Sequence, residues 1–197
     1  MKSVLHVGCG HRHNGAHLPA GFLRQDWREI RLDIDPAAEP DIVGSMLDMS
    51  ALDDGSVDAI YSAHNIEHVY PHEVPKILNE FLRVLRADGF LVVTCPDLQA
   101  VCALVAEDRL TDTAYVSPAG PITPLDMLYG HVSALAAGHG YMAHKCGFTL
   151  KSLTHALEGG GFGVLGPVGL EGDLRHAPGL GPFGGDEFGP LGAATVQ

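Results

Sequence analysis

The sequence predicts an α/β protein with a doubly wound, mostly parallel sheet and helices on both of its faces. A short apolar run over 4–7 ends in Gly8-Cys9-Gly10, as a buried strand entering a tight turn does. Apolar residues then recur at steps of three and four over 74–85, and the continuous apolar stretch 90–94 follows. Helical patterns that alternate with buried strands indicate a single Rossmann-like domain.

The other elements follow the same alternation. Strands are expected at 4–7, 30–34, 41–43, 56–62, 90–94 and 162–165. Helices are expected over 74–85 with Gly89 as the stop, over 98–109, within 123–137, and over 150–158 with Thr149 as N-cap. The first crossover helix should follow the glycine turn, but the glycines and proline within 11–21 make it short, late or absent.

We divide the chain into a domain over 1–165, which contains a lid-like insertion at 97–147, and a tail over 166–197. The tail holds nine glycines and four prolines in 32 positions, so we expect little regular structure there. No convincing final strand is visible, which leaves the edge hairpin of the sheet incomplete. Because an open edge pairs readily with another chain, a homodimer is a reasonable hypothesis.

Composition narrows the class of protein and its partners. The 197 residues carry a formal charge of −12 and no run of lysine or arginine, which argues against nucleic acid as a partner. The four cysteines form no CxxC pair, as in the reduced thiols of a cytoplasmic protein. We expect neither a signal peptide nor a membrane span, since no basic-then-apolar leader and no apolar stretch of about 20 residues is visible.

A ligand site is predicted where the first two strands end. Gly8 and Gly10 let the main chain approach a ligand closely. Asp33 follows Gly10 by 23 residues, which is near the separation at which nucleotide-binding α/β folds place an acid on the ribose hydroxyls. A dinucleotide oxidoreductase is less favoured, because its fingerprint would need glycine at His13.

These segments resemble the class I S-adenosylmethionine (SAM)-dependent methyltransferases. Residues 4–10 (VLHVGCG) resemble their motif I, and residues 32–35 (LDID) resemble their second-strand acid. Residues 48–62 resemble the adenine-side loop with the fourth strand, and 65–69 and 78–98 match the type 11-like branch. That branch includes small methyltransferases often associated with surface-polysaccharide genes. The resemblance extends over 3–98 and, more weakly, over 140–165.

The resemblance implies SAM as the cofactor and S-adenosylhomocysteine as its product. The implied cofactor-binding residues are Gly8, Cys9, Gly10, Asp33, Ile34, Asp48, Met49, Ala63 and His64. Within this set, Asp33 binds the ribose hydroxyls, and Asp48 with the main chain of Met49 meets the adenine edge. Two positions depart from the family pattern, since His6 stands where an acid is usual and Arg12 where a third glycine is usual.

Methyl transfer depends mainly on positioning, and it needs a base only where the acceptor must lose a proton. His64 and His68 are the candidates for such a base, because the resemblance places the sulfonium just past the fourth strand. In a helix they would share one face; the alternative is that they only cap or pack. A zinc site of His64, His68 and either Glu67 or His72 lacks a recognisable spacing, so no metal is predicted.

The insertion carries the candidate acceptor contacts. His131, His139, His144 and Lys145 would form a local basic patch suited to an anionic acceptor such as a carboxylate, a phosphate or an acidic sugar. Asp97 follows the fifth strand and either lines the pocket or caps the next helix. The predicted acceptor-binding residues are Asp97, His131, His144 and Lys145. A solvated loop is the alternative interpretation.

The leading hypothesis is a SAM-dependent methyltransferase that acts on a small-molecule or glycan acceptor by O-methylation. Residues 63–66 (AHNI) lack the Asn/Asp-Pro-Pro-aromatic run of exocyclic-amine methyltransferases, which favours an oxygen acceptor or a small-molecule amine. One rival is a catalytically degenerate protein that binds SAM or S-adenosylhomocysteine and transfers nothing. A second rival binds no cofactor and is a structural or metal-binding protein.

Overall fold

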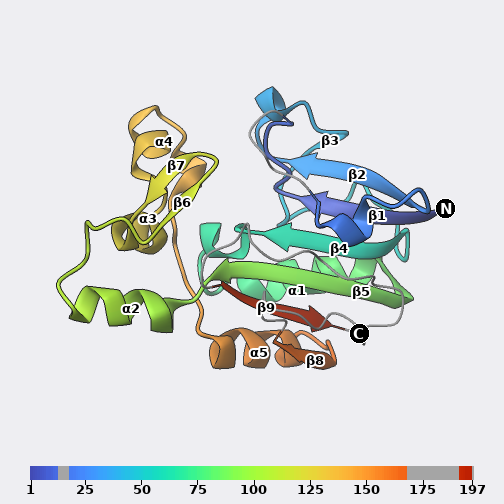
Figure 1. The fold of residues 1–197 in the computed structure, drawn as a ribbon. Helices are drawn as coiled ribbons and strands as arrows, with labels where there is room; N and C mark the ends of the chain where they lie inside the picture. Colours follow the sequence, from blue (N-terminus) through green and yellow to red (C-terminus); the bar gives the residue numbers. More distant parts are fainter. Residues whose placement is uncertain (13–17, 168–190, 197) are drawn as a thin grey trace.

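The computed structural model describes residues 1–12, 18–167 and 191–196, which form one seven-stranded sheet with helices packed against it (Figure 1). The strand order is β3-β2-β1-β4-β5-β9-β8. All strands from β3 to β5 are parallel, whereas β9 runs antiparallel to both β5 and β8. The predicted Rossmann-like α/β fold is therefore confirmed.

The five parallel strands place the glycine turn at the point where the order of the strands reverses. They are β1 (Lys2–Val7), β2 (Trp27–Asp33), β3 (Ile42–Val43), β4 (Val57–Ala63) and β5 (Leu85–Pro96). The chain moves outward from β1 through β2 to β3, and then crosses to β4 on the other side of β1. Open α/β sheets bind ligands at this switch point, outside the carboxyl ends of the strands.

Among the described residues, α-helices cover one face of the sheet, and the turn segment around Ala20–Phe22 covers the other, so α-helices are found on one of the two faces on which they were expected. The helices α1 (Val74–Val84) and α5 (Leu150–Gly159) pack on one face, where Leu5 of β1 and Phe81 of α1 are fully buried. On the opposite face, Val4 of β1 lies in a smaller cluster with Phe22 and Trp27. Successive side chains of β1 thus point to opposite faces and pack into two hydrophobic cores, as expected for a central parallel strand.

The insertion over 97–147, which we call the lid, stands beyond the carboxyl ends of β4 and β5 (Figure 1). It contains α2 (Leu98–Ala106), the hairpin β6 (Tyr115–Ser117) and β7 (Gly120–Ile122), α3 (Pro124–Tyr129), α4 (Val132–Ala136) and the 3-10 helix η4 (Gly140–Met142). The sequence predicted the helices but not the hairpin. The other 3-10 helices are η1 (Ala20–Phe22), η2 (Pro36–Ala38) and η3 (Ile66–His68). Among the described residues, no helix is long and apolar enough to cross a membrane.

The prediction that Gly89 ends the helix over 74–85 is wrong. The helix α1 ends at Val84, and β5 begins at the next residue, so Gly89 lies inside the strand. A Cβ atom at this position would lie 3.0 Å from the carbonyl oxygen of Arg86 and 3.1 Å from that of Asp58. The glycine is therefore needed for the close approach of neighbouring main chains.

The prediction of an unstructured tail without a final strand is wrong for residues 191–196. They form β9 (Leu191–Val196), which pairs with β5 from Leu91 to Pro96 and also with β8 (Val164–Pro167). The sheet thus extends past residue 165. The open β5 edge on which the homodimer hypothesis rested is covered. Residues 13–17 of the expected first crossover, and residues 168–190 and 197 of the tail, lie outside the described residues.

Candidate functional site

The carboxylate of Asp33 is held at the carboxyl end of β2. Its Oδ2 atom accepts a hydrogen bond from the main-chain N–H of Gly10 at 2.8 Å, and its Oδ1 atom accepts one from that of Asp35 at 2.9 Å. The residue is only 8% exposed. Since a carboxylate oxygen accepts two hydrogen bonds, each oxygen keeps a lone pair that suits a ribose hydroxyl.

The glycine turn is clamped to the end of β4 by Asn65. The Asn65 Nδ2 group donates to the carbonyl oxygens of Val7 at 2.6 Å and Ala63 at 3.0 Å. Gly8 and Gly10 have φ angles of +63° and +57°, in the left-handed region that favours glycine. A Cβ atom at Gly8 would also collide with the Asn65 side chain. Glycine is therefore required at Gly8 by both its conformation and its neighbour.

The departure at His6 is compensated by the neighbouring strand. The His6 Nδ1 atom lies 2.8 Å from Oε1 of Glu29 on β2, and this hydrogen bond outweighs burial and lowers the pKa of Glu29. Arg31, also on β2 and 2% exposed, donates from Nη2 to the carbonyl oxygen of Gly10 at 2.5 Å. Next to this turn, burial raises the pKa of the Cys9 thiol to about 11. The glycine turn thus has an acidic side chain next to it, but this acid is Glu29 on β2 and not residue 6. The thiol of Cys9 stays neutral.

On the predicted adenine side, the main chain of Met49 is bonded to α1. Its N–H donates to Oε2 of Glu80 at 2.8 Å, and its carbonyl oxygen accepts from Nη2 of Arg83 at 2.9 Å. Asp48 is exposed, and Ile34 is 55% exposed although it is apolar. Ile34 therefore presents an apolar surface directly after Asp33, and Asp48 presents its carboxylate to solvent.

A buried carboxylate without a hydrogen bond lies past the end of β4. Glu67 is 1% exposed, and neither of its oxygens accepts a hydrogen bond from any residue that the structure describes. Among the described residues, the nearest basic group is Nδ1 of His64, 3.5 Å from Oε1. Burial alone would raise the pKa of Glu67, but the contact with His64 and the charges of His64 and His68 lower it. An ionised carboxylate is therefore buried at this point.

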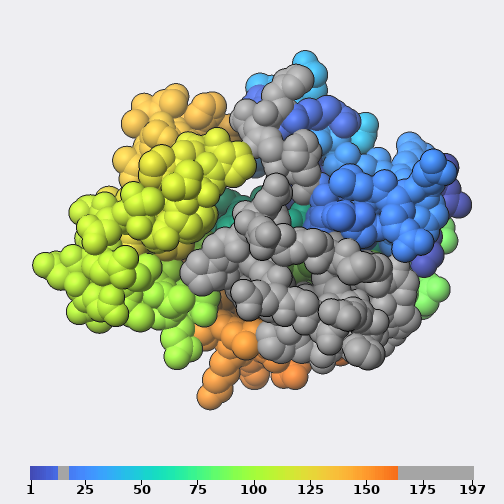
Figure 2. Space-filling model, in the orientation of Figure 1, coloured from blue at the N-terminus to red at the C-terminus, as the bar shows by residue number. Residues whose placement is uncertain are grey.

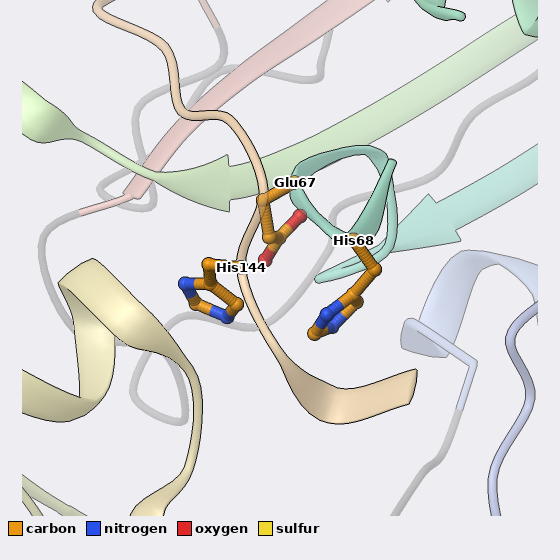
Figure 3. Close-up of side chains that lie close together, drawn as sticks. All are labelled: Glu67, His68 and His144. Atoms are coloured by element: carbon orange, nitrogen blue, oxygen red, sulfur yellow. The ribbon is translucent and has the colours of Figure 1, made fainter. Parts of the chain in front are cut away.

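Two histidines from distant parts of the chain meet at Glu67 (Figure 3). The Nδ1 atom of His68 lies 3.2 Å from the carbonyl oxygen of Ala143, and that of His144 lies 2.9 Å from the carbonyl oxygen of Met127. The ring centroids of the two histidines are 4.9 Å apart. One ligand atom each from Glu67, His68 and His144 lies within 4.8 Å of the other two. Burial lowers the pKa of His144, which favours its neutral form.

His64 and His68 do not share a helix face, so that part of the sequence interpretation is wrong. Only residues 66–68 are helical, as the 3-10 turn η3, and His64 precedes it with a left-handed φ of +53°. The main-chain N–H of His64 donates to the carbonyl oxygen of Thr94 at 2.9 Å, which fixes it beside β5. The two histidines meet around Glu67 instead.

The residues of the predicted acceptor site contact different partners. Asp97 caps α2 by accepting from the N–H of Gln99 at 2.9 Å. The ring of His131 contacts the Ser133 hydroxyl, and the Lys145 ammonium lies 5.1 Å from the centre of the Tyr70 ring. Of the four predicted acceptor-binding residues, only His144 joins the cluster around Glu67. No pattern in the sequence indicates this contact, because it depends on how the lid places His144.

The lid also reaches across to the cofactor side. The Tyr141 hydroxyl donates to Oδ2 of Asp35 at 2.7 Å and lies 2.8 Å from Nδ1 of His139. Burial and this hydrogen bond raise the pKa of Tyr141 to about 12, so it stays a donor. In Figure 2, teal atoms of the chain around β4 are visible beside the lid. The lid thus contacts the segment that follows β2.

A known protein family matches part of this chain. Residues 5–93 match the family model of the methyltransferase domain of type 11. This range contains the glycine turn, Asp33 and the segment of Glu67, but not the lid. No curated protein matches the sequence. Residues 5–93 thus carry the type 11 methyltransferase domain, and this match together with the fold supports a class I SAM-dependent methyltransferase whose cofactor is SAM. The association with surface-polysaccharide genes stays a prediction.

Solved structures share the fold at low identity. A SAM-dependent methyltransferase from Methanosarcina mazei superposes with a TM-score of 0.60 at 18% identity, over 99% of this chain and 91% of the other. A 1,6-didemethyltoxoflavin-N1-methyltransferase from Burkholderia thailandensis, bound to S-adenosylhomocysteine, gives 0.56 at 16%, over 98% and 69%. A TehB-like methyltransferase from Corynebacterium glutamicum gives 0.52 at 18%, over 100% and 79%.

The residues at the carboxyl edge fit SAM. Asp33 keeps acceptor capacity for two hydroxyl groups, and it lies beside the turn that the left-handed Gly8 and Gly10 form. The apolar Ile34 surface and the Asp48 carboxylate suit an adenine ring with its amino group. The roles that the resemblance implies for these residues toward the ribose, methionine and adenine portions stay a prediction.

Proposed function

We propose that this methyltransferase acts on a hydroxyl oxygen of a small-molecule or glycan acceptor, with His64 as the general base. The observation that carries the proposal is the pairing of His64 with a buried carboxylate: its Nδ1 atom lies 3.5 Å from Oε1 of Glu67. A hydroxyl must lose its proton during methyl transfer, whereas a neutral amine attacks before it loses one. A positioned base therefore favours a hydroxyl acceptor.

The geometry suits a histidine base whose ring is oriented by a carboxylate at its Nδ1 atom. With Nδ1 of His64 directed to Glu67, its Nε2 atom is left to accept a proton from the acceptor. The His64 side chain is 34% exposed, so an acceptor has access to it, while the Glu67 side chain is 1% exposed. Glu67 is then a positioning residue that stabilises the imidazolium as it forms.

The cofactor residues complete the proposed arrangement. SAM, when bound, supplies an activated methyl group. Asp33 would hold the ribose hydroxyls, and Ile34 and Asp48 would face the adenine ring. Ala63 and His64, at the end of β4, would lie on the side of the methyl group and the acceptor. The main chain of Met49 would contribute less to binding of the adenine ring than the resemblance implies, because its N–H and carbonyl groups are already hydrogen-bonded to Glu80 and Arg83.

Transfer of a radiolabelled methyl group from SAM to matched hydroxyl, carboxylate and amine acceptors tests the proposal. We expect labelling of hydroxyl acceptors only. His64→Asn should lower kcat by about 10²–10⁴-fold and leave SAM affinity unchanged, since asparagine tolerates the left-handed φ of this position. His155→Ala, at an exposed position of α5, serves as the matched control. Labelling of amines alone, or a His64→Asn variant with full activity, would overturn the proposal.

A further inference from the structure

The contact with His64 alone does not explain why the carboxylate of Glu67 is buried without a hydrogen bond. A buried carboxylate that lacks hydrogen bonds costs free energy, so native proteins pair such groups or use them to bind an ion. Here both oxygens lack a hydrogen bond within the described part of the chain, and the 3.5 Å approach of His64 involves only Oε1. The second oxygen is therefore available to a ligand.

The two neighbouring histidines are oriented as metal ligands are. A carbonyl oxygen only accepts, so the contacts with Ala143 and Met127 place the proton of each imidazole on Nδ1. In the neutral ring, Nε2 then carries a lone pair. An Nδ1–H group that donates to a main-chain carbonyl is the usual outer support of a metal-binding histidine.

The three groups converge from two separate elements. Glu67 and His68 belong to η3, and His144 belongs to the segment by which the lid returns to the domain (Figure 3). That segment is fixed to η3, because the N–H groups of Lys145 and Cys146 donate to the carbonyl oxygen of Glu67 at 2.8 Å and 3.2 Å. His144 is therefore held in place by main-chain bonds next to its own position.

We propose that Glu67, His68 and His144 form a binding site for a divalent first-row transition-metal ion. One carboxylate and two imidazoles are a ligand set that zinc enzymes use, with an open position left for water or substrate. Ligand atoms around tetrahedral zinc lie about 3.3 Å apart, against a spread of up to 4.8 Å here. Closure on the ion therefore requires the ligand atoms to move together by about 1 Å.

The proposed ion would connect the lid to the end of β4. It shares Glu67 with the proposed base His64, with Oε1 directed to His64 and the other oxygen directed to the ion. An open metal position at this point would suit an oxygen ligand from the acceptor. The site rests on its own three ligands, so its existence does not depend on the acceptor class proposed above.

The test is a titration of the full-length protein with ZnCl₂ by calorimetry after removal of metal with a chelator. We expect one Zn²⁺ per chain. His68→Ala and His144→Ala should each weaken binding by at least about 100-fold, beyond the 10–100-fold of outer-shell changes. His155→Ala is the matched control, because it removes an exposed histidine of α5 and should leave affinity unchanged. The melting temperature should rise with Zn²⁺ in the wild type and the control, but not in the ligand variants.

Two results would overturn the proposal: no Zn²⁺ binding by the folded wild type, or equal affinity in His144→Ala and His155→Ala. Far-UV circular dichroism and S-adenosylhomocysteine binding establish that each variant is folded. If His144→Ala does not fold, Glu67→Gln gives the same test, since the amide keeps the shape of the side chain and removes its charge. Methyl transfer does not enter this readout, so failure of the metal site is distinct from failure of the proposed function.

Discussion

Two parts of the carboxyl edge of the sheet differ in how their polar side chains are hydrogen-bonded. They are the cofactor side, around Asp33 and Asn65, and the proposed acceptor side, around His64 and Glu67. On the cofactor side, Asp33 accepts two main-chain hydrogen bonds and Asn65 donates two. On the acceptor side, Glu67 accepts none from the residues described, although it is more deeply buried than Asp33. Satisfied groups stabilise the fold, whereas an unsatisfied buried charge opposes it. The hydrogen bonds of the cofactor side thus stabilise the fold. On the acceptor side, the carboxylate of Glu67 stays available for a ligand.

The largest effect is expected at the clamp of the cofactor side. Gly8→Ala should lower the free energy of unfolding by about 3 kcal/mol, from the left-handed φ and from displacement of Asn65 out of its two hydrogen bonds. Gly55→Ala is the matched control, since Gly55 has a φ of +59° but nothing within 4 Å of an added Cβ, so it should cost about 1 kcal/mol. Urea unfolding measures both, and equal costs would mean that Asn65 does not hold the turn.

The same chemical change should cost different amounts on the two sides. Asp33→Asn should lower the free energy of unfolding by about 1 kcal/mol, because the amide nitrogen cannot accept one of the two hydrogen bonds from main-chain N–H groups. Glu67→Gln should lower that of the metal-free protein by less, because the cost of burying the Glu67 charge largely offsets its attraction to His64 and His68. Denaturant unfolding in the presence of a chelator measures both. A larger loss of stability in Glu67→Gln than in Asp33→Asn would break the comparison.

The pair Glu80–Arg83, which holds the Met49 loop, should show a pH-dependent contribution. Arg83 lowers the pKa of Glu80 from its ordinary value of 4.5 to about 2. A lowered pKa in the folded state stabilises the fold above pH 4.5, and this contribution is lost as the pH falls from 4.5 toward 2. Glu80→Gln should cost about 1 kcal/mol at pH 7. Its unfolding curve should converge with that of the wild type near pH 2, and a difference that stays constant with pH would contradict this account.

The smallest effect is expected where the lid touches the cofactor side. Tyr141→Phe removes the hydrogen bond to Asp35 at an exposed position, so global stability should change by less than about 0.5 kcal/mol. Amide hydrogen exchange over 139–142 should nevertheless become faster, because this contact holds the lid tip to the domain. Unchanged exchange in this segment would show that the contact does not hold the lid.

Local patterns sufficed for the cofactor side but not for the acceptor side. The glycine turn, Asp33 and the periodic helix over 74–84 are each encoded within a few residues, so the sequence placed them correctly. The meeting of His144 with Glu67 depends on how the lid returns past η3, and no spacing in the sequence reports that path. Gly89 and β9 were misjudged for a related reason, since close main-chain approach and edge pairing are tertiary effects.

Calorimetric titration of the protein with S-adenosylhomocysteine, compared between wild type and Asp33→Asn, tests the central claim most directly. Asp58→Asn is the matched control, because Asp58 also accepts a main-chain hydrogen bond, from Ser3, but at the amino edge of the sheet. We predict a dissociation constant in about the micromolar range for the wild type and the control, and binding at least about tenfold weaker in Asp33→Asn. Equal affinity in all three proteins, or none in the folded wild type, would contradict a cofactor site at the end of β2.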